Sequence, residues 1–122
     1  MDMRLELVPL PTTDVDRSKE FYVDRVGFSL DHDIEPGNGM RVVQLTPPGS
    51  ACSIVVGRGI GDPGAGRVQG LHLVVDDIEA ARAQLLGTGV DVSAVSDMGG
   101  VEYAYSSDPD GNSWALQELL RR

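Results

Sequence analysis

The chain repeats its own pattern at a spacing of about half its length. Asp14 and Asp77 each stand ahead of a helical pattern of apolar residues, an offset of 63 positions (77 minus 14). Pro47 and Pro109 each open a turn that contains glycine, an offset of 62 positions (109 minus 47). Because the two offsets nearly agree, the 122 residues are predicted to contain two consecutive copies of one structural unit.

Each copy is predicted to begin with a strand followed by a capped helix. In the first copy, Thr13 and Asp16 have the spacing of a helix N-terminal cap, and Gly27 is the expected stop. In the second copy, Asp76 and Glu79 have the same cap spacing. The apolar residues between cap and stop recur at helical intervals in both copies.

Three further strands are predicted after each helix. The first of them covers residues 28–34 in one copy and 90–95 in the other. The last two strands are expected to form a hairpin around 47–49 or 109–111, where proline starts the turn and glycine supplies the positive φ. Each copy is therefore predicted to be a β-α-β-β-β module, and the fold class to be α+β.

A glycine-rich stretch joins the two copies. It lacks the G-K-S/T ending of a phosphate-binding loop, and no helix opens directly after it, so a linker is predicted over about 58–68. Residues 1–122 are then one domain, with module one over about 1–57 and module two over about 69–122.

Charge and composition exclude several classes of function. A formal net charge of -9 repels phosphate backbones and anionic membranes, so neither nucleic acid nor membrane is an expected partner. No apolar run is long enough to span a bilayer. The single cysteine, Cys52, cannot form an internal disulfide, which favours a reducing, cytoplasmic location.

Three stretches of the chain, in phase with the repeat, carry a family resemblance. They are "DVDRSKEFY", "VVDDIEAARAQL" and "DPDGNSWALQE". Together they resemble the vicinal oxygen chelate superfamily, which includes glyoxalases, bleomycin-resistance-type binding proteins and extradiol dioxygenases. The resemblance implies a curved mixed sheet that forms a half-open barrel, with helices on its convex side and a small-molecule ligand in the concave cleft. It also implies a homodimer.

The same resemblance implies four metal-ligand positions, one on the first and one on the last strand of each module. In this sequence they are occupied by Leu7, Ser53, Gly70 and Ala115. Three of these side chains have no donor atom, and a lone serine hydroxyl is a poor ligand for a divalent metal. The sequence therefore predicts neither the usual metal centre nor any other cofactor.

His72 lies two residues beyond Gly70, on the same face of the predicted strand. A shift of two residues moves it by roughly 6.6 Å along the strand, so it is predicted to lie in the cleft without replacing the missing metal histidine. Three roles stay open for it. The alternatives are a strand histidine that is hydrogen-bonded to a neighbour, a residue that contacts the ligand, and an acid-base catalyst.

The second predicted hairpin brings two tyrosines onto the same face as His72. With a three-residue loop over 109–111, Tyr105 opposes Ala115 and Tyr103 opposes Gln117. Directly opposed residues share one face of a sheet, so both tyrosines and Gln117 are expected to line the cleft. The alternative is that the tyrosines simply fill core volume.

The first hairpin, counted in the same way around 47–49, opposes Val43 to Ser53 and Arg41 to Val55. Val43 and Arg41 are then also predicted to face the cleft, although Arg41 has an alternative as a surface ion-pair partner. The predicted ligand-binding set is Arg41, Val43, His72, Tyr103, Tyr105 and Gln117.

Three functions compete at this point. The first is metal-independent binding of a small organic molecule, suggested by the loss of metal donors from an otherwise intact cleft. The second is a metal-independent lyase or epimerase that uses His72 for proton transfer. The third is a metal-dependent glyoxalase or dioxygenase with atypical ligands such as His72 and Gln117.

Overall fold

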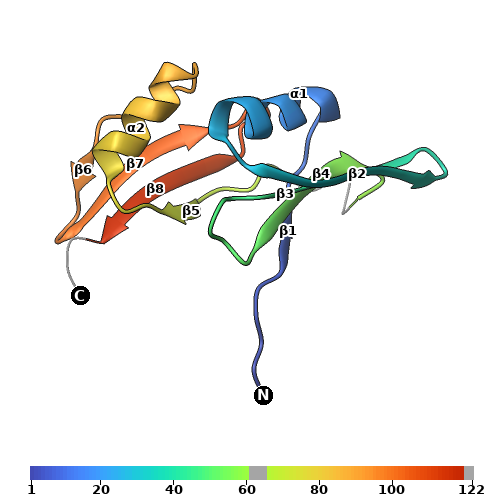
Figure 1. Cartoon of the computed structure of the whole chain (residues 1–122), viewed down its shortest axis with the longest axis horizontal. Coiled ribbons are helices and arrows are strands. Elements are labelled where there is room, and N and C mark those ends of the chain that lie inside the picture. Colours follow the sequence, from blue (N-terminus) through green and yellow to red (C-terminus); the bar gives the residue numbers. More distant parts are fainter. Residues whose placement is uncertain (61–65, 120–122) are drawn as a thin grey trace. The chain divides into compact units, whose positions relative to one another are not determined.

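The protein consists of two β-α-β-β-β modules. The computed structural model describes residues 1–60 and 66–119, and the chain divides into the compact units Met1–Arg67 and Val68–Arg122 (Figure 1). The element order confirms the predicted α+β class with tandem modules. The middle of the predicted linker, 61–65, lies outside the described residues.

The first module is a four-stranded mixed sheet with one helix. Its elements are β1 (Leu7–Pro9), α1 (Val15–Glu20), the π-helical segment η1 (Phe21–Val26), β2 (Ser29–Gly37), β3 (Met40–Thr46) and β4 (Ser53–Arg58). The strand order is β1-β4-β3-β2, and only the β1–β4 pair is parallel. The buried core includes Tyr22, Val43, Leu45, Ile54 and Val56.

The second module repeats this plan. Its elements are β5 (Leu71–Val74), α2 (Ile78–Gly87), β6 (Ser96–Asp97), β7 (Val101–Ser107) and β8 (Ser113–Leu119), in the strand order β5-β8-β7-β6. Helix α2 lies along β7 and β8 (Figure 1). The amide of Ile78 donates a 2.7 Å hydrogen bond to Oε1 of Glu118, which ties the start of α2 to β8. No helix among the described residues is long and apolar enough to cross a membrane.

Both helix caps lie one residue later than predicted. Asp14 accepts a hydrogen bond from the amide of Arg17 at 3.1 Å, and Asp77 accepts one from Ala80 at 3.0 Å. The extended backbone at Asp14 and Asp77 lets each carboxylate reach back over the first helical turn. The predicted caps at Thr13 and Asp76 are therefore wrong, whereas the offset between the modules is confirmed.

The strand predicted over 90–95 is also wrong, because β6 is confined to Ser96–Asp97. The Ser93 amide donates to the Tyr105 carbonyl at 2.9 Å, but the Tyr105 amide donates to the Ser93 side-chain oxygen at 2.8 Å. A hydroxyl thus replaces the carbonyl that a regular ladder would supply, and the segment follows β7 without forming a strand.

The two hairpins differ in register. In the second module Tyr105 pairs with Ala115 and Tyr103 with Gln117, as predicted. In the first module Val43 pairs with Val56 and Arg41 with Arg58, so the predicted pairings with Ser53 and Val55 are wrong. The observed partners on β4 lie three residues later than the predicted ones. Because three is an odd number, β3 presents the opposite face to the one predicted from its pairing with β4.

The longer loop of the first hairpin explains this displacement. The Ser50 amide donates to the Pro47 carbonyl at 3.0 Å, which closes a turn. The Cys52 amide then donates to the Ser50 hydroxyl at 3.1 Å, which bends the chain a second time before β4 begins at Ser53. A serine-based turn therefore follows the proline-glycine turn and lengthens the loop.

As a consequence, Arg41 and Val43 lie on the helix-facing side of the first sheet. Val43 is fully buried. Arg41 donates from Nη1 to Asp16 at 2.8 Å, and from Nε and Nη2 to Asp33 at 3.0 and 2.8 Å. Lys19 also donates to Asp33 at 2.8 Å. Arg41 is thus engaged in an ion-pair network with α1 and β2, as in the alternative considered for it from sequence.

The second hairpin is held by a buried polar cluster. Asp108 is 6% exposed and Asn112 fully buried. The Asp108 amide donates to the Asn112 carbonyl at 2.9 Å, and Nδ2 of Asn112 donates to Oδ2 of Asp108 at 2.8 Å. Oδ1 of Asn112 accepts from the amide of Val68 at 2.9 Å, so the cluster also anchors the chain that leads into β5.

We predict that Asn112→Ala destabilises the protein by about 2–3 kcal/mol, because it leaves buried partners of the amide unsatisfied. Urea denaturation followed by circular dichroism measures the free energy of unfolding. The exposed Gln84 on α2 supplies the control, since Gln84→Ala is expected to change stability by less than about 0.5 kcal/mol. Equal effects of the two substitutions would contradict the role of the cluster.

A second prediction concerns the stability of the ion-pair network at low pH. Hydrogen bonds from Arg41 and then Lys19 hold the pKa of Asp33 well below its ordinary value. The charged network therefore stabilises the fold fully above the unfolded pKa of about 4, and this contribution is lost as pH falls below it. Asp33→Asn should lower the free energy of unfolding by about 2 kcal/mol at pH 7.

The difference in free energy of unfolding between wild type and Asp33→Asn should become smaller as the pH is lowered. Denaturation series at pH 7 and pH 3 measure this difference. The control is Glu35→Gln, because Glu35 lies 3.8 Å from Arg58 and both side chains are exposed. This pair is expected to contribute under about 1 kcal/mol. A difference in free energy of unfolding that is the same at both pH values would contradict the stabilising role of the charged Asp33 carboxylate.

Candidate functional site

The second module contains an open cavity of about 510 Å³. It is lined by Gly70, His72, Asp91, Val92, Ser93, Tyr105, Ser106, Ser107, Ser113, Trp114 and Ala115. These residues come from β5 and the residue before it, from β7 and β8, and from the segment that follows α2. The cavity therefore lies at the end of the sheet near the Asp108–Asn112 cluster.

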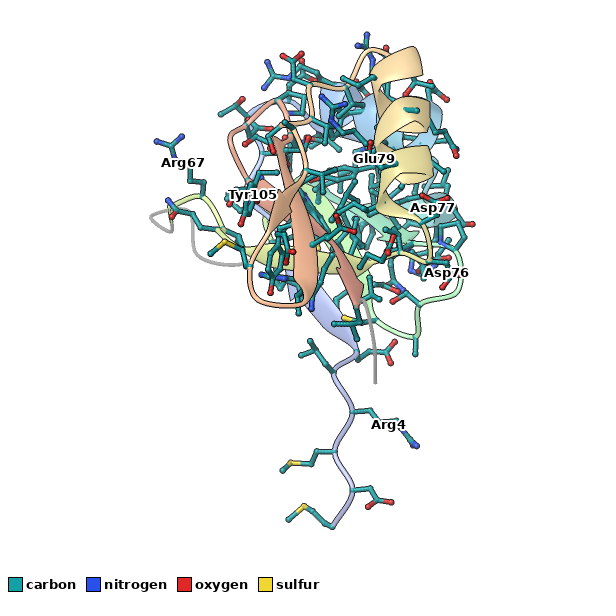
Figure 2. The ribbon with its side chains drawn as sticks, turned by 90° about the vertical axis from the view of Figure 1, so that its left-hand side faces the viewer. Arg4, Arg67, Asp76, Asp77, Glu79 and Tyr105 are labelled. Atoms are coloured by element: carbon teal, nitrogen blue, oxygen red, sulfur yellow. The ribbon has the colours of Figure 1, made fainter. Side chains whose placement is uncertain are left out.

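Strand pairing places four of the predicted site residues on one face of this sheet. His72 pairs with Ala115, which in turn pairs with Tyr105. In the next row Gln117 pairs with Tyr103. Figure 2 shows Tyr105 on the side of the strands away from α2. The face predicted for His72, Tyr103, Tyr105 and Gln117 is thus the one observed.

His72 is oriented by a hydrogen bond to a neighbouring strand. Its Nδ1 lies 2.8 Å from Oε1 of Gln117. With the amide oxygen of Gln117 turned toward the ring, as in this geometry, the oxygen accepts the hydrogen bond and Nδ1 donates it. In the neutral ring, Nε2 is then the unprotonated nitrogen and acts as a hydrogen-bond acceptor.

The aromatic rings form an ordered wall beside His72. Tyr103 and Tyr105 stack with centroids 6.2 Å apart and planes 12° apart. His72 meets Tyr103 edge-on, with centroids 5.8 Å apart and planes at 90°. Tyr105 stays 50% exposed, so it retains surface on which a ligand can pack.

Small side chains form the floor between His72 and Tyr105. Ala115 lies between them on β8, and Ser113 and Gly70 lie beside it toward the hairpin. The Gly70 amide donates to the Ser113 hydroxyl at 2.9 Å, and Gly70 has a φ of +80°. The positive φ suits glycine, which keeps this end of the floor free of side-chain atoms.

Several lining residues were missed from sequence. Ser107 and Ser113 could have been found, because they continue the alternation of Tyr105 and Ala115 toward the turn. Asp91, Val92 and Ser93 carried no usable signal, because their segment was predicted to be a regular strand. Arg41 and Val43, by contrast, belong to the first module and do not line this cavity. Tyr103 and Gln117 contact His72 from the same face of the sheet, but they are not among the residues that line the cavity either.

The four positions at which the family resemblance implies metal ligands fall into two pairs, Leu7 with Ser53 in the first module and Gly70 with Ala115 in the second. Leu7 pairs directly with Ser53, whose hydroxyl lies 2.6 Å from that of Thr46. In the second module His72, rather than Gly70, lies opposite Ala115. The pairing of the first strand with the last strand is therefore shifted by two residues in the second module relative to the first.

The residues at these positions do not fit the usual metal centre. Leucine, glycine and alanine offer no donor atoms, and the serine hydroxyl is engaged with its neighbour. Across residues 1–60 and 66–119, no group of three His, Cys, Asp or Glu side chains is arranged to hold an ion.

A family model matches residues 4–116 of the chain, that of the Glyoxalase/Bleomycin resistance protein/Dioxygenase superfamily. The chain belongs to this superfamily. The resemblance noted from the sequence is thereby confirmed. No curated protein matches the chain.

Solved structures of the superfamily are similar along almost the whole chain. TnmS3, an antibiotic binding protein from Streptomyces sp. CB03234, is 34% identical, with a TM-score of 0.85 and 97% of each chain covered. A glyoxalase/bleomycin resistance protein from the same organism is 35% identical, with a TM-score of 0.78 over 93% of this chain and 98% of that one. A superfamily member from Sphaerobacter thermophilus DSM 20745 is 26% identical, with a TM-score of 0.82 over 96% and 98%.

The His72–Gln117 bond predicts a single tautomer for the imidazole. In wild type at a pH where the ring is neutral, the hydrogen should reside on Nδ1. Gln117→Leu removes the acceptor and should yield a mixture dominated by the other tautomer. Long-range ¹H–¹⁵N correlation spectra distinguish the two nitrogens. A wild-type ring protonated on Nε2 would contradict the geometry.

Proposed function

We propose that this protein binds a small organic molecule in the cavity of its second module, without the metal centre typical of the superfamily. The observation that carries the proposal is the open 510 Å³ cavity, which is lined both by the ring of Tyr105 and by the imidazole of His72 that Gln117 orients. Its volume lies within the range of small-molecule sites, and a few polar groups on apolar walls are their usual composition.

The structural relatives support this choice within the superfamily. TnmS3 is described as an antibiotic binding protein and shares 34% of its sequence with this chain. Sequestration of an antibiotic or a related metabolite is therefore the form of binding that we propose.

Metal independence is supported by the side chains at the implied ligand positions. Leu7, Gly70 and Ala115 supply no donor, and Ser53 is hydrogen-bonded to Thr46. Elemental analysis of protein purified without chelators tests the point. A stoichiometric transition metal that disappears in His72→Ala would favour the atypical metal-dependent enzyme instead.

A metal-independent lyase or epimerase is the second candidate, because Nδ1 of His72 lies 2.8 Å from Gln117. A histidine oriented in this way can accept a proton at Nε2 from a bound substrate. The observation that separates the candidates is turnover. A compound bound by wild type should be recovered unchanged if the protein only binds, whereas conversion abolished by His72→Asn with binding retained would establish catalysis.

We also propose that the protein is a homodimer and acts in the cytoplasm. The superfamily resemblance supports the dimer, and the single cysteine supports a reducing compartment. Size-exclusion chromatography with light scattering tests the oligomeric state, and a monomer over the whole concentration range would contradict it.

The cavity can be filled without disturbing the core, which gives a direct test of binding. Ser107 is exposed on the cavity wall, so Ser107→Trp should occupy the ligand volume and weaken binding at least about tenfold. Gln84→Trp is the control, because Gln84 is exposed on α2 and does not line the cavity. Thermal-shift screening of metabolites and antibiotics identifies ligands, and titration calorimetry measures them. Equal affinity in both variants would place binding elsewhere.

A further inference from the structure

The groups around the cavity specify the hydrogen-bonding character of the ligand. This inference rests on the proposed binding function and concerns the same site. We infer that the ligand is an uncharged or cationic aromatic molecule that donates a hydrogen bond, from a ring hydroxyl or amino group, to Nε2 of His72.

The tautomer of His72 sets the kind of hydrogen bond that the ring can offer to a ligand. Because Nδ1 donates to Oε1 of Gln117, the nitrogen that remains for a ligand is an acceptor in the neutral ring. An ether or ketone oxygen placed at Nε2 would leave two acceptors facing each other. A hydroxyl or N–H group placed there completes the hydrogen bond.

The shape of the gap between His72 and Tyr105 favours a flat ring. His72, Ala115 and Tyr105 lie in one row across three adjacent strands and all three line the cavity. Neighbouring strands are about 4.8 Å apart, so the two outer residues are about 10 Å apart along this row. The ring of Tyr103 lies 5.8 Å from that of His72 and 6.2 Å from that of Tyr105, and borders the gap on the side of the next row. A flat ring above Ala115 would have its substituent directed at His72 and its body against Tyr105.

The charges around the cavity disfavour an anionic ligand. Among the described residues that line the cavity there is one carboxylate, Asp91, and neither a lysine nor an arginine. The whole chain carries a net charge of -9. An anionic ligand would therefore lack a counter-charge and meet a repulsive field, whereas neutral and cationic ligands would not.

Three probes of nearly equal size separate these features. 2-Naphthol donates a hydrogen bond, 2-methoxynaphthalene cannot, and 2-naphthoate carries a negative charge. Their dissociation constants for the full chain can be measured by titration calorimetry or by the fluorescence of the naphthalene ring. Wild type should bind 2-naphthol about tenfold more tightly than its methyl ether, and 2-naphthoate most weakly.

Two histidine variants test whether His72 causes the preference for 2-naphthol over its methyl ether. His72→Phe should abolish the tenfold ratio while it keeps binding of the methyl ether. His32→Phe is the matched control, because His32 is also exposed on a strand and lies 3.2 Å from a glutamine, Gln44, in the first module. This control should keep the wild-type ratio.

The outcomes distinguish this inference from the proposed function. If both neutral probes bind equally and Ser107→Trp abolishes both, the cavity binds small molecules but the donor preference is wrong. Tightest binding of 2-naphthoate would overturn the charge argument, and loss of the ratio in His32→Phe alone would move the contact away from His72. If no probe binds, the inference falls, and the compound screen alone decides the proposed function.

Discussion

The hydrogen bonds between Asp108 and Asn112 are the constraint on which the second module depends. They close the hairpin with Asp108 opposite Asn112, and this pairing sets the register of the whole β7–β8 ladder. A register shifted by one residue would turn β7 over relative to β8, so that Tyr105 and Ala115 would no longer share a face and the cavity would lose one of its walls. The same asparagine binds the amide of Val68 and thereby leads the chain into β5, which carries His72.

The cavity owes its volume to positions that the superfamily resemblance implies as metal-ligand sites. Ala115 and Gly70 have side chains too small to fill the space between His72 and Tyr105. Side chains without donor atoms at these positions have two physical consequences. They offer no ligand to an ion, and they leave space beside an imidazole that Gln117 orients.

The contrast between the two hairpins explains which predictions were correct. The loop around 109–111 has its polar cluster encoded in adjacent residues, so counting outward from the turn gave the observed pairs. The loop after Thr46 contains a second turn, built by the Ser50 hydroxyl, whose hydrogen bond to the Cys52 amide has no strong sequence signal. The pairing of β3 with β4 is therefore shifted by three residues from the predicted one, so Arg41 and Val43 lie on the helix-facing side of the sheet and not on the predicted cleft side. The prediction of a strand over 90–95 was wrong for a similar reason, since the Ser93 side chain takes the place of a backbone acceptor.

The sequence by itself determined the repeat, the α+β class, the family resemblance and the face of the second sheet that carries His72, Tyr103, Tyr105 and Gln117. These follow from local chemistry, namely capping residues, alternation along strands and a turn closed by its own side chains. Only the tertiary structure decided that His72 lies opposite Ala115, that Nδ1 is bonded to Gln117, and that Arg41 faces α1. Those contacts join residues far apart in the chain, and their geometry depends on loop lengths and side-chain positions that no local pattern specifies.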